Sequence, residues 1–555
     1  MDALTRQGPG ISEDSREKIL HTKGRADVRY DAVVVGAGFA GLYSLHALRQ
    51  LGMAVRAFEA GDDVGGTWYW NGYPGARCDV ESVDYSYSFS EALQQEWTWT
   101  ERFASREEIL AYLRFVADRL DLRRDISLGT RVIAAEYDEA ANSWNVRTSR
   151  GERISARFCI MATGCLSAAT VPQFEGLAEF QGHWLHTGNW PKEVVDLTGR
   201  RVGVIGTGSS GIQVIPSIAD KVEHLYVFQR TPSFSVPARN ALLDPAFMQK
   251  TKASYGVRRM RNRQSAAGYV YDPNFESALE VPDDRRRQEF ELRWEKGGAC
   301  FLVAYKDLLL SHEANEAAAD FVREKIRRIV RDPHVAEALI PRDYPIGARR
   351  LCLDSGYYDT FNRANVTLVD LLEQPIERIV PEGVRTKSAT YPLDVLIFAT
   401  GYDAMTGPLL AIDIRGRARM SLRKKWAVGP RTYLGLSVAG FPNLFVVAGP
   451  GSPSVLSNVV VSIEQHVEWI AACLRHMRER SLTMVEAEPA SESAWVEHVN
   501  ALADRTLYPL ARSWYSGDNI AGKPRVFMPY VGGVKRYREH CEQVAAEGYQ
   551  GFVLS

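Results

Sequence analysis

Three glycines near the N-terminus have the spacing of a loop that holds a pyrophosphate. Gly36, Gly38 and Gly41 follow the β-branched run at residues 31–35, and an apolar helical pattern comes after them. The first glycine permits a tight turn, the second lets the backbone approach a phosphate, and the third lets the helix pack on the strand. Glu59 ends the next apolar run, where its carboxylate can accept hydrogen bonds from ribose hydroxyls. The sequence predicts a dinucleotide site, and its N-terminal position favours FAD.

A second glycine turn follows the apolar run at residues 201–205 and implies a second nucleotide. Its motif residues and the residues that end its second strand are Gly206, Gly208, Ser209, Gly211, Arg230 and Thr231. An arginine therefore stands where the first unit has a carboxylate. A guanidinium suits a 2′-phosphate, so this nucleotide is expected to be NADPH rather than NADH. The alternative is a surface arginine without a ligand.

Two such turns require two strand–turn–helix units, each built on a mostly parallel sheet. The fold class expected is α/β, with two Rossmann-like domains of the two-dinucleotide flavoprotein type and a helical insertion in the NADP domain. We expect a flexible leader at 1–27, FAD-binding segments at 28–165 and 393–555, NADP-binding segments at 166–239 and 343–392, and the helical insertion at 240–342.

Composition limits the classes of partner and compartment. The 555 residues suit two or three domains, and the formal net charge of −1 offers no field for a polyanion, so we expect no nucleic acid. No apolar run approaches the ~18 residues of a membrane span. The seven cysteines are scattered without a CxxC pair, which suits reduced thiols in the cytoplasm and argues against a metal site or an active-site dithiol. A monomer is expected.

Two longer motifs narrow the reaction. The segment FQGHWLHTGNWP carries Phe180, Gly182, His186, Trp190 and Pro191, and the segment GGTWYWNGYPGARCD carries Gly66, Trp68 and Asp79. Both resemble the signatures of type I Baeyer-Villiger monooxygenases, and the resemblance extends over nearly the whole chain. Within the first motif, His186 and Trp190 are expected mainly to pack a domain junction rather than to react.

The resemblance implies an oxygen insertion that side chains alone could not perform, because activation of dioxygen needs a cofactor. NADPH reduces FAD, dioxygen gives a C4a-peroxyflavin, and attack on a ketone carbonyl yields an ester or lactone. Ketone and dioxygen are thus the expected small-molecule partners.

Four residues receive roles from the resemblance. Arg350 falls on the family's active-site arginine, which must offset negative charge in a water-poor pocket, and Asp79 is its expected partner. Arg349 stands where relatives usually have a lysine that helps to bind the NADPH phosphate, so the charge is kept and the geometry changes. Trp514 resembles a loop tryptophan that closes on the cofactor, with a packing role as the alternative.

The expected substrate pocket is formed by Cys165 and by the loop at residues 454–459. The residues that we assign to it are Cys165, Ser454, Val455, Leu456 and Val459. Changes of one or two methylenes in such a pocket typically shift discrimination by ~1–3 kcal/mol, which reorders ketones without naming one.

Two other functions remain as alternatives. A flavin monooxygenase that oxidises nitrogen or sulfur would share both nucleotide units, but its signature lacks the Trp190–Pro191 ending. A redox sensor that binds FAD and NADPH would have no use for a charge pair beside the flavin.

Overall fold

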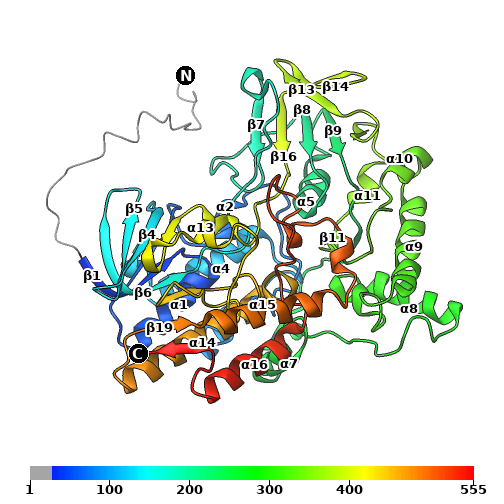
Figure 1. Cartoon of the computed structure of the whole chain (residues 1–555). Coiled ribbons are helices and arrows are strands. Elements are labelled where there is room, and N and C mark those ends of the chain that lie inside the picture. The colour runs from blue at the N-terminus through cyan, green and yellow to red at the C-terminus, as the bar shows by residue number, and fades with distance from the viewer. Residues whose placement is uncertain (1–27) are drawn as a thin grey trace.

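The β-branched run before the first glycine turn forms the centre of an eight-stranded sheet (Figure 1). The computed structural model describes residues 28–555, so the expected leader at 1–27 lies outside the described residues. Strand β1 (Val28–Val35) pairs in parallel with β2 (Val55–Phe58) and with β6 (Arg153–Met161). The other strands of this sheet are β3 (Ile126–Ser127), β4 (Val132–Asp138), β5 (Ser143–Thr148), β17 (Asp413–Arg415) and β18 (Leu444–Val446). The sheet therefore unites strands from residues 28–161 with strands from residues 413–446.

The second glycine turn belongs to a separate five-stranded sheet. Its order is β12-β9-β8-β16-β7, and every neighbouring pair is parallel. The strands are β7 (His183–His186), β8 (Arg201–Ile205), β9 (His224–Gln229), β12 (Val366–Asp370) and β16 (Val395–Phe398). Helix α1 (Phe39–Gln50) follows the first turn and α5 (Ser209–Ile218) follows the second. The expected α/β class with two Rossmann-like units is confirmed.

Strand β16 corrects one expected boundary. The apolar run at residues 393–401 was assigned to the returning FAD-binding segment, but β16 pairs with β8 and β7 in the NADP-side sheet. All four residues of β16 are apolar and buried, as expected of a strand that is covered on both faces. Such a run fits a central parallel strand of either sheet. The chain therefore leaves the second sheet after β16 rather than at residue 392.

The segment between the two halves of the second sheet is helical. It contains α6 (Pro245–Ala253), α7 (Tyr255–Gln264), α8 (Asp283–Lys296), α9 (His312–Ile329) and α10 (Pro333–Ala338). Side chains at the N-caps of α6, α9 and α10 accept hydrogen bonds from the first turn, which satisfies amide groups that a helix leaves unpaired. In Figure 1, α8, α9 and α10 lie to the right of the second sheet, whereas α7 lies at the bottom beside α16 (Gly533–Ala546).

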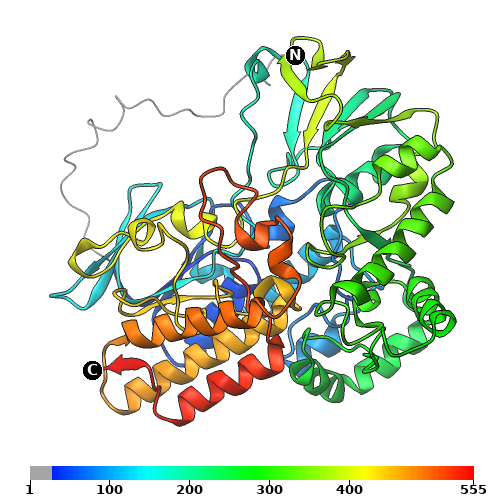
Figure 2. The same ribbon diagram turned by 45° about the vertical axis from the view of Figure 1, so that its right-hand side comes forward.

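The described chain also contains a small antiparallel sheet and three C-terminal helices. The sheet comprises β13 (Ile376–Val380), β14 (Gly383–Thr386) and β15 (Thr390–Pro392). Helices α14 (Val459–Glu479), α15 (Pro489–Ala503) and α16 (Gly533–Ala546) lie side by side below the first sheet (Figure 2). Helix α14 also packs on α1, which links the C-terminal third to the first glycine turn.

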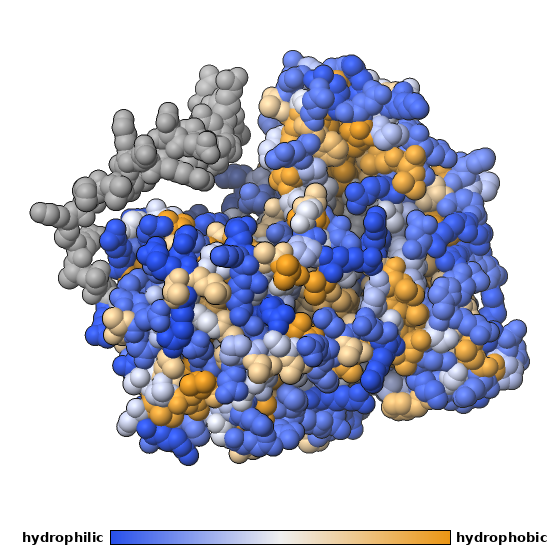
Figure 3. Space-filling model, in the orientation of Figure 1, coloured by the Kyte–Doolittle hydropathy of each residue, from blue (hydrophilic) through white to orange (hydrophobic). Residues whose placement is uncertain are grey.

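The surface visible in Figure 3 is mostly hydrophilic. Its apolar residues form separate patches, several of them near the centre and in the upper part of the view. Within residues 28–555, no helix combines the length and apolar character needed to cross a membrane. All seven cysteines are buried and free.

Candidate active site

The first glycine turn has no room for larger residues at its three motif positions. Gly36 has a φ of +107°, and a Cβ on Gly41 would lie 1.9 Å from the Gly36 carbonyl oxygen. Gly38 caps α1, and a Cβ there would approach the Cα of Gly66 to 3.3 Å. The turn thus brings bare backbone to the N-terminus of α1, where amide groups and the helix dipole favour a phosphate.

Glu59 braces this turn from the end of β2. It is 5% exposed, and its carboxylate accepts hydrogen bonds from the Ala37 N–H (2.7 Å) and the Gly61 N–H (2.8 Å). Burial raises its pKa above the ordinary value. Gly66 caps a short helix that carries the buried Trp68, whose indole N–H has no acceptor among the described residues. The expected contact of Glu59 with a ribose stays a prediction.

The second turn repeats the geometry of the first. Gly206 has a φ of +111°, and a Cβ on Gly211 would lie 2.2 Å from the Gly206 carbonyl oxygen. Gly208 has φ −82° and ψ −167°, beside −82° and −163° for Gly38. A Cβ on Gly208 would meet no described atom within 4 Å, so its backbone faces open space in front of α5, which begins at Ser209. Both turns fit a dinucleotide phosphate.

Two arginines lie near the second turn. Arg230 follows β9 and is exposed, and the adjacent Thr231 carbonyl accepts a hydrogen bond from the Thr207 hydroxyl (3.0 Å). The Arg349 guanidinium lies 4.2 Å from the Tyr344 ring centroid, and its buried Nε has no partner in the described part of the chain. Burial lowers the pKa of Arg349, and the positive charge of Arg230 lowers it further. Two cations that repel each other suit an anion such as a 2′-phosphate.

Arg350 and Asp79 form a bidentate ion pair. The Arg350 Nε donates to Asp79 Oδ2 (2.8 Å), and Nη2 donates to Asp79 Oδ1 (2.7 Å). The Arg350 Nη1 donates to the Val455 carbonyl (2.6 Å). Burial on its own lowers the pKa of Arg350, but the Asp79 carboxylate outweighs this, so the pKa lies above its ordinary value. The two side chains are 29% and 28% exposed, so a fixed positive charge remains accessible at this point.

Three tyrosines that the motifs did not indicate lie near this guanidinium. They are Tyr269 after α7, Tyr508 and Tyr515, and the charge of Arg350 opposes the rise in pKa that burial causes in each phenol. Burial raises the pKa of Tyr515 to about 12, although the charge of Arg350 opposes the rise. All three phenols are therefore neutral near pH 7 and can donate hydrogen bonds. No sequence signal marked them, because tyrosine is common in this chain.

The expected pocket residues gather in adjoining clusters. One apolar cluster contains Cys165, Met405, Ala448, Met528, Val455, Val459 and Trp514, and a neighbouring one contains Val455, Leu456, Trp514, Tyr515 and Phe527. The Cys165 thiol lies 3.2 Å from the Ala448 carbonyl and 3.2 Å from the hydroxyl of the buried Ser454. Ser454 has a φ of +40°, a strained value for a residue with a Cβ. The loop with Cys165 and the loop with Val455 therefore meet within reach of Arg350.

His186 ends β7 of the second sheet and contacts the two segments that connect the sheets, one before β7 and one after β16. Its Nδ1 accepts a hydrogen bond from the Gly188 N–H (2.9 Å), and its Nε2 lies 3.2 Å from the Thr170 carbonyl and 3.3 Å from the Thr400 hydroxyl. Burial lowers the pKa of His186, so the ring is neutral. These contacts are all to connecting segments.

The other residues of this motif make packing contacts. The backbone N–H of Trp190 donates to the Trp70 carbonyl (3.2 Å), and the Trp190 side chain is buried. A Cβ on Gly182 would meet the Phe180 ring at 2.5 Å, and Pro191 is half-buried. This motif thus contacts the FAD-binding segment at Trp70, and none of its residues is hydrogen-bonded to Arg350 in the described structure.

Comparisons with known proteins agree with this geometry. The model of flavin-binding monooxygenase-like proteins matches residues 30–241. The acetone monooxygenase (methyl acetate-forming) of Gordonia sp. (strain TY-5) is 43% identical over 529 residues, which cover 95% of this chain and 99% of that protein. A phenazine N-monooxygenase of Lysobacter antibioticus is 41% identical over 534 residues, which cover 95% and 97%. A solved structure of an oxidised steroid monooxygenase bound to NADP has a TM-score of 0.91 and 52% identity, and the match covers 95% and 99%.

The fold, the two glycine turns and the matched family model define a flavin-binding monooxygenase. Within that class, identity over nearly the full length shows that the chain belongs to the type I Baeyer-Villiger monooxygenase family. The resemblance inferred from the sequence is confirmed, and so are FAD and NADPH as its cofactors. Among residues 28–555, no cluster of three or more potential ligands could hold a metal ion.

Proposed function

We propose that this chain inserts one oxygen atom of dioxygen beside a ketone carbonyl, giving an ester or lactone at the expense of NADPH. The observation that supports it most is the bidentate pair of Arg350 and Asp79. This pair, together with the Nη1 contact to the Val455 carbonyl, holds a positive charge beside the loop assigned to the ketone pocket. A redox sensor would not need a fixed cation at that place. When bound, FAD and NADPH supply the electrons and the activation of dioxygen.

The side chains supply charge, position and exclusion of water. In this proposal Arg350 stabilises the negative charge that develops on the reacting oxygen atoms, and Asp79 fixes the plane of its guanidinium. Cys165, Val455 and Val459 line an apolar wall, where a charge interaction is stronger than in water. The phenol of Tyr515, kept neutral by burial, would add a hydrogen-bond donor near Arg350.

The nucleotide roles follow from the two turns. We assign the FAD pyrophosphate to the turn at Gly38 and the NADPH pyrophosphate to the turn at Gly208. Arg230 and Arg349 would bind the 2′-phosphate, and Trp514 would cover the bound nucleotide from the edge of the pocket cluster. The enzyme is proposed to be a cytoplasmic monomer that binds no nucleic acid; free, buried cysteines support the cytoplasm, and a net charge of −1 argues against a polyanionic partner.

Nitrogen oxidation is the second candidate, because a related chain is a phenazine N-monooxygenase. The test is product analysis by gas chromatography and mass spectrometry with FAD, NADPH, oxygen and a panel of phenylacetone, cyclohexanone, progesterone and phenazine. Ester or lactone in proportion to NADPH consumed supports the proposal. An N-oxide with no ester would favour the second candidate, and hydrogen peroxide alone from every ketone would contradict the proposal.

A further inference from the structure

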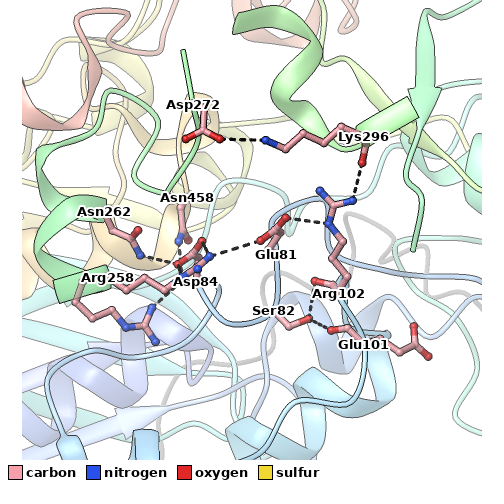
Figure 4. A network of polar contacts seen from close by, with 11 residues as sticks. Glu81, Ser82, Asp84, Glu101, Arg102, Arg258, Asn262, Asp272, Lys296 and Asn458 are labelled. Atoms are coloured by element: carbon pink, nitrogen blue, oxygen red, sulfur yellow. Dashed lines mark hydrogen bonds and ion pairs between the residues drawn. The ribbon is translucent and has the colours of Figure 1, made fainter. Parts of the chain in front are cut away.

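A polar network around the buried Asp84 joins three segments from different parts of the sequence (Figure 4). The first is the loop that follows Asp79, the second is helix α7 with the residues after it, and the third is the start of α14. Figure 4 shows Asp84 at the point where side chains from all three segments meet. Asp84 is only 1% exposed, yet none of the family motifs includes it.

The Asp84 carboxylate binds helix α7 through two of its residues. The Arg258 Nε donates to Asp84 Oδ1 and its Nη2 donates to Asp84 Oδ2, both at 2.6 Å. The Asn262 amide, one turn further along the same face of α7, donates to Asp84 Oδ1 (2.9 Å). A buried carboxylate needs such donors, because removal from water without them costs several kcal/mol. The pairing therefore fixes α7 against the loop.

The Asp84 main chain binds the N-terminus of α14. The Asn458 side-chain amide donates to the Asp84 carbonyl (2.7 Å), while the Asn458 Oδ1 caps α14 by accepting from the Val460 N–H (3.2 Å). The Asn458 N–H donates to the carbonyl of Ala267, three residues after the end of α7. Asn458 is fully buried, so these bonds form without competition from water.

Two of the three segments contact the guanidinium of Arg350 directly. Asp79 lies five residues before Asp84, and the Val455 carbonyl lies three residues before Asn458. The segment after α7 is held beside the Val455 loop by the bond between the Asn458 N–H and the Ala267 carbonyl (2.8 Å), and it carries Tyr269, whose pKa is raised by burial and lowered by the charge of Arg350. Asp84 thus lies in the first segment and is bonded, directly or through Asn458, to the other two.

We propose that Asp84 is a positioning residue that sets the placement of Asp79, Tyr269 and the Val455 carbonyl around Arg350. The inference rests on the proposed function and adds a residue to it that touches neither substrate nor cofactor. A bidentate pair tolerates little displacement, and a shift of about 1 Å in a positioned group can cost roughly 10²-fold in rate. Loss of the Asp84 contacts should therefore disturb oxygen insertion more than reduction of the flavin.

The experiment compares the FAD-loaded enzyme with Asp84→Asn, which keeps the shape and removes the charge, and with Asn458→Asp, which keeps the helix cap and removes the donor to Asp84. Asp272→Asn is the matched control, since Asp272 belongs to the same network but its side chain is 83% exposed and pairs with Lys296 (3.1 Å). Three quantities are measured: the rate of flavin reduction by NADPH, the ratio of ester to NADPH consumed, and the thermal midpoint.

We expect the rate of flavin reduction to stay within twofold of wild type in both variants. The ratio of ester formed to NADPH consumed should fall about tenfold, with a matching rise in hydrogen peroxide. The control variant should show no change in either quantity. An unchanged ester ratio in a folded Asp84→Asn would overturn the proposal. Ester and flavin reduction that fall together with the thermal midpoint would also overturn it, since that is the behaviour of a merely structural residue.

Two further measurements keep the test decisive. If Asp84→Asn does not fold, Arg258→Lys keeps the charge and loses the second contact, and the same shift from ester to peroxide is expected at smaller size. A crystal structure of the variant should show the Arg350–Val455 contact, 2.6 Å here, broken or lengthened. An unmoved Arg350–Val455 contact in the variant would contradict the positioning role of Asp84, whether or not the wild type makes ester. A wild type that makes no ester would count against the proposed function alone.

Discussion

The guanidinium of Arg350 donates to both carboxylate oxygens of Asp79, a residue 271 positions earlier in the chain. This pair connects the loop that follows the first glycine unit to the segment just before β11 (Cys352–Asp354), beyond the helical insertion. The contact exists only when both dinucleotide-binding halves are in place. The charge at the site is therefore a product of the whole fold rather than of one motif.

Asp79→Asn should slow ester formation by roughly 10–10²-fold, because an amide accepts at one oxygen and leaves one Arg350 donor unpaired. Asp79→Ala should cost more, since it removes both acceptors. Steady-state ester formation at saturating ketone measures the effect, with FAD content as a check on binding. Equal rates in Asp79→Asn and wild type would mean that the ion pair has no part in the reaction.

Arg230→Ala should raise KM for NADPH by roughly tenfold or more, the size expected for loss of a charged hydrogen bond to phosphate, and leave KM for NADH nearly unchanged. The exposed Arg157 on β6 provides the control variant Arg157→Ala. Initial rates with each nucleotide give both constants. Equal increases for NADPH and NADH would show that Arg230 does not recognise the 2′-phosphate.

The sequence predicted the two glycine turns because their chemistry is local: each glycine performs its role within a few residues of backbone. The family resemblance added Arg350 and Asp79, which no spacing rule could have paired. Tyr269, Asp84 and Asn458 escaped prediction, since their contacts join segments far apart in the chain and a buried polar residue has no periodic signature.

Strand β16 shows the same limit for the fold. Its run ends in Ala-Thr-Gly, as does the run of β6, and both read as buried parallel strands. Only pairing with β8 assigns β16 to the second sheet. An apolar run predicts burial on both faces but not the neighbour that provides it.

Val459→Ala should shift preference toward bulkier ketones, because Val459 packs in the cluster with Cys165 and Trp514 and its truncation enlarges the pocket. A change of up to about tenfold in the ratio of kcat/KM for progesterone and phenylacetone is expected, the usual size for one or two methylenes. Val194→Ala, at a position that is 98% exposed, serves as control. An unaltered ratio would remove Val459 from the pocket wall.

His466 should make stability depend on pH. Burial, with a contribution from the Arg538 charge, lowers its pKa from 6.5 to about 3. The ring is neutral because Nδ1 accepts from the Ala448 N–H (2.9 Å), so a proton there would face a donor. Because the folded-state pKa is the lower one, the stabilisation is complete above pH 6.5 and is lost as pH falls from 6.5 toward 3.

Between pH 7.5 and 5.5 this group should lower the free energy of unfolding by about 1.4 kcal/mol, one pKa unit of linkage. Urea unfolding of wild type and of His466→Gln measures it, and the variant should lack this part of the pH dependence. Parallel pH profiles for the two proteins would show that His466 is protonated alike in the folded and unfolded states.

The most direct test of the central claim is a comparison of wild type with Arg350→Ala in which flavin reduction and ester formation are followed in the same sample. The account predicts that NADPH still reduces the flavin while ester formation falls by at least roughly 10²–10³-fold and hydrogen peroxide takes its place. Ester formation at the wild-type rate in the variant would contradict the assignment of Arg350 as the charge that makes oxygen insertion possible.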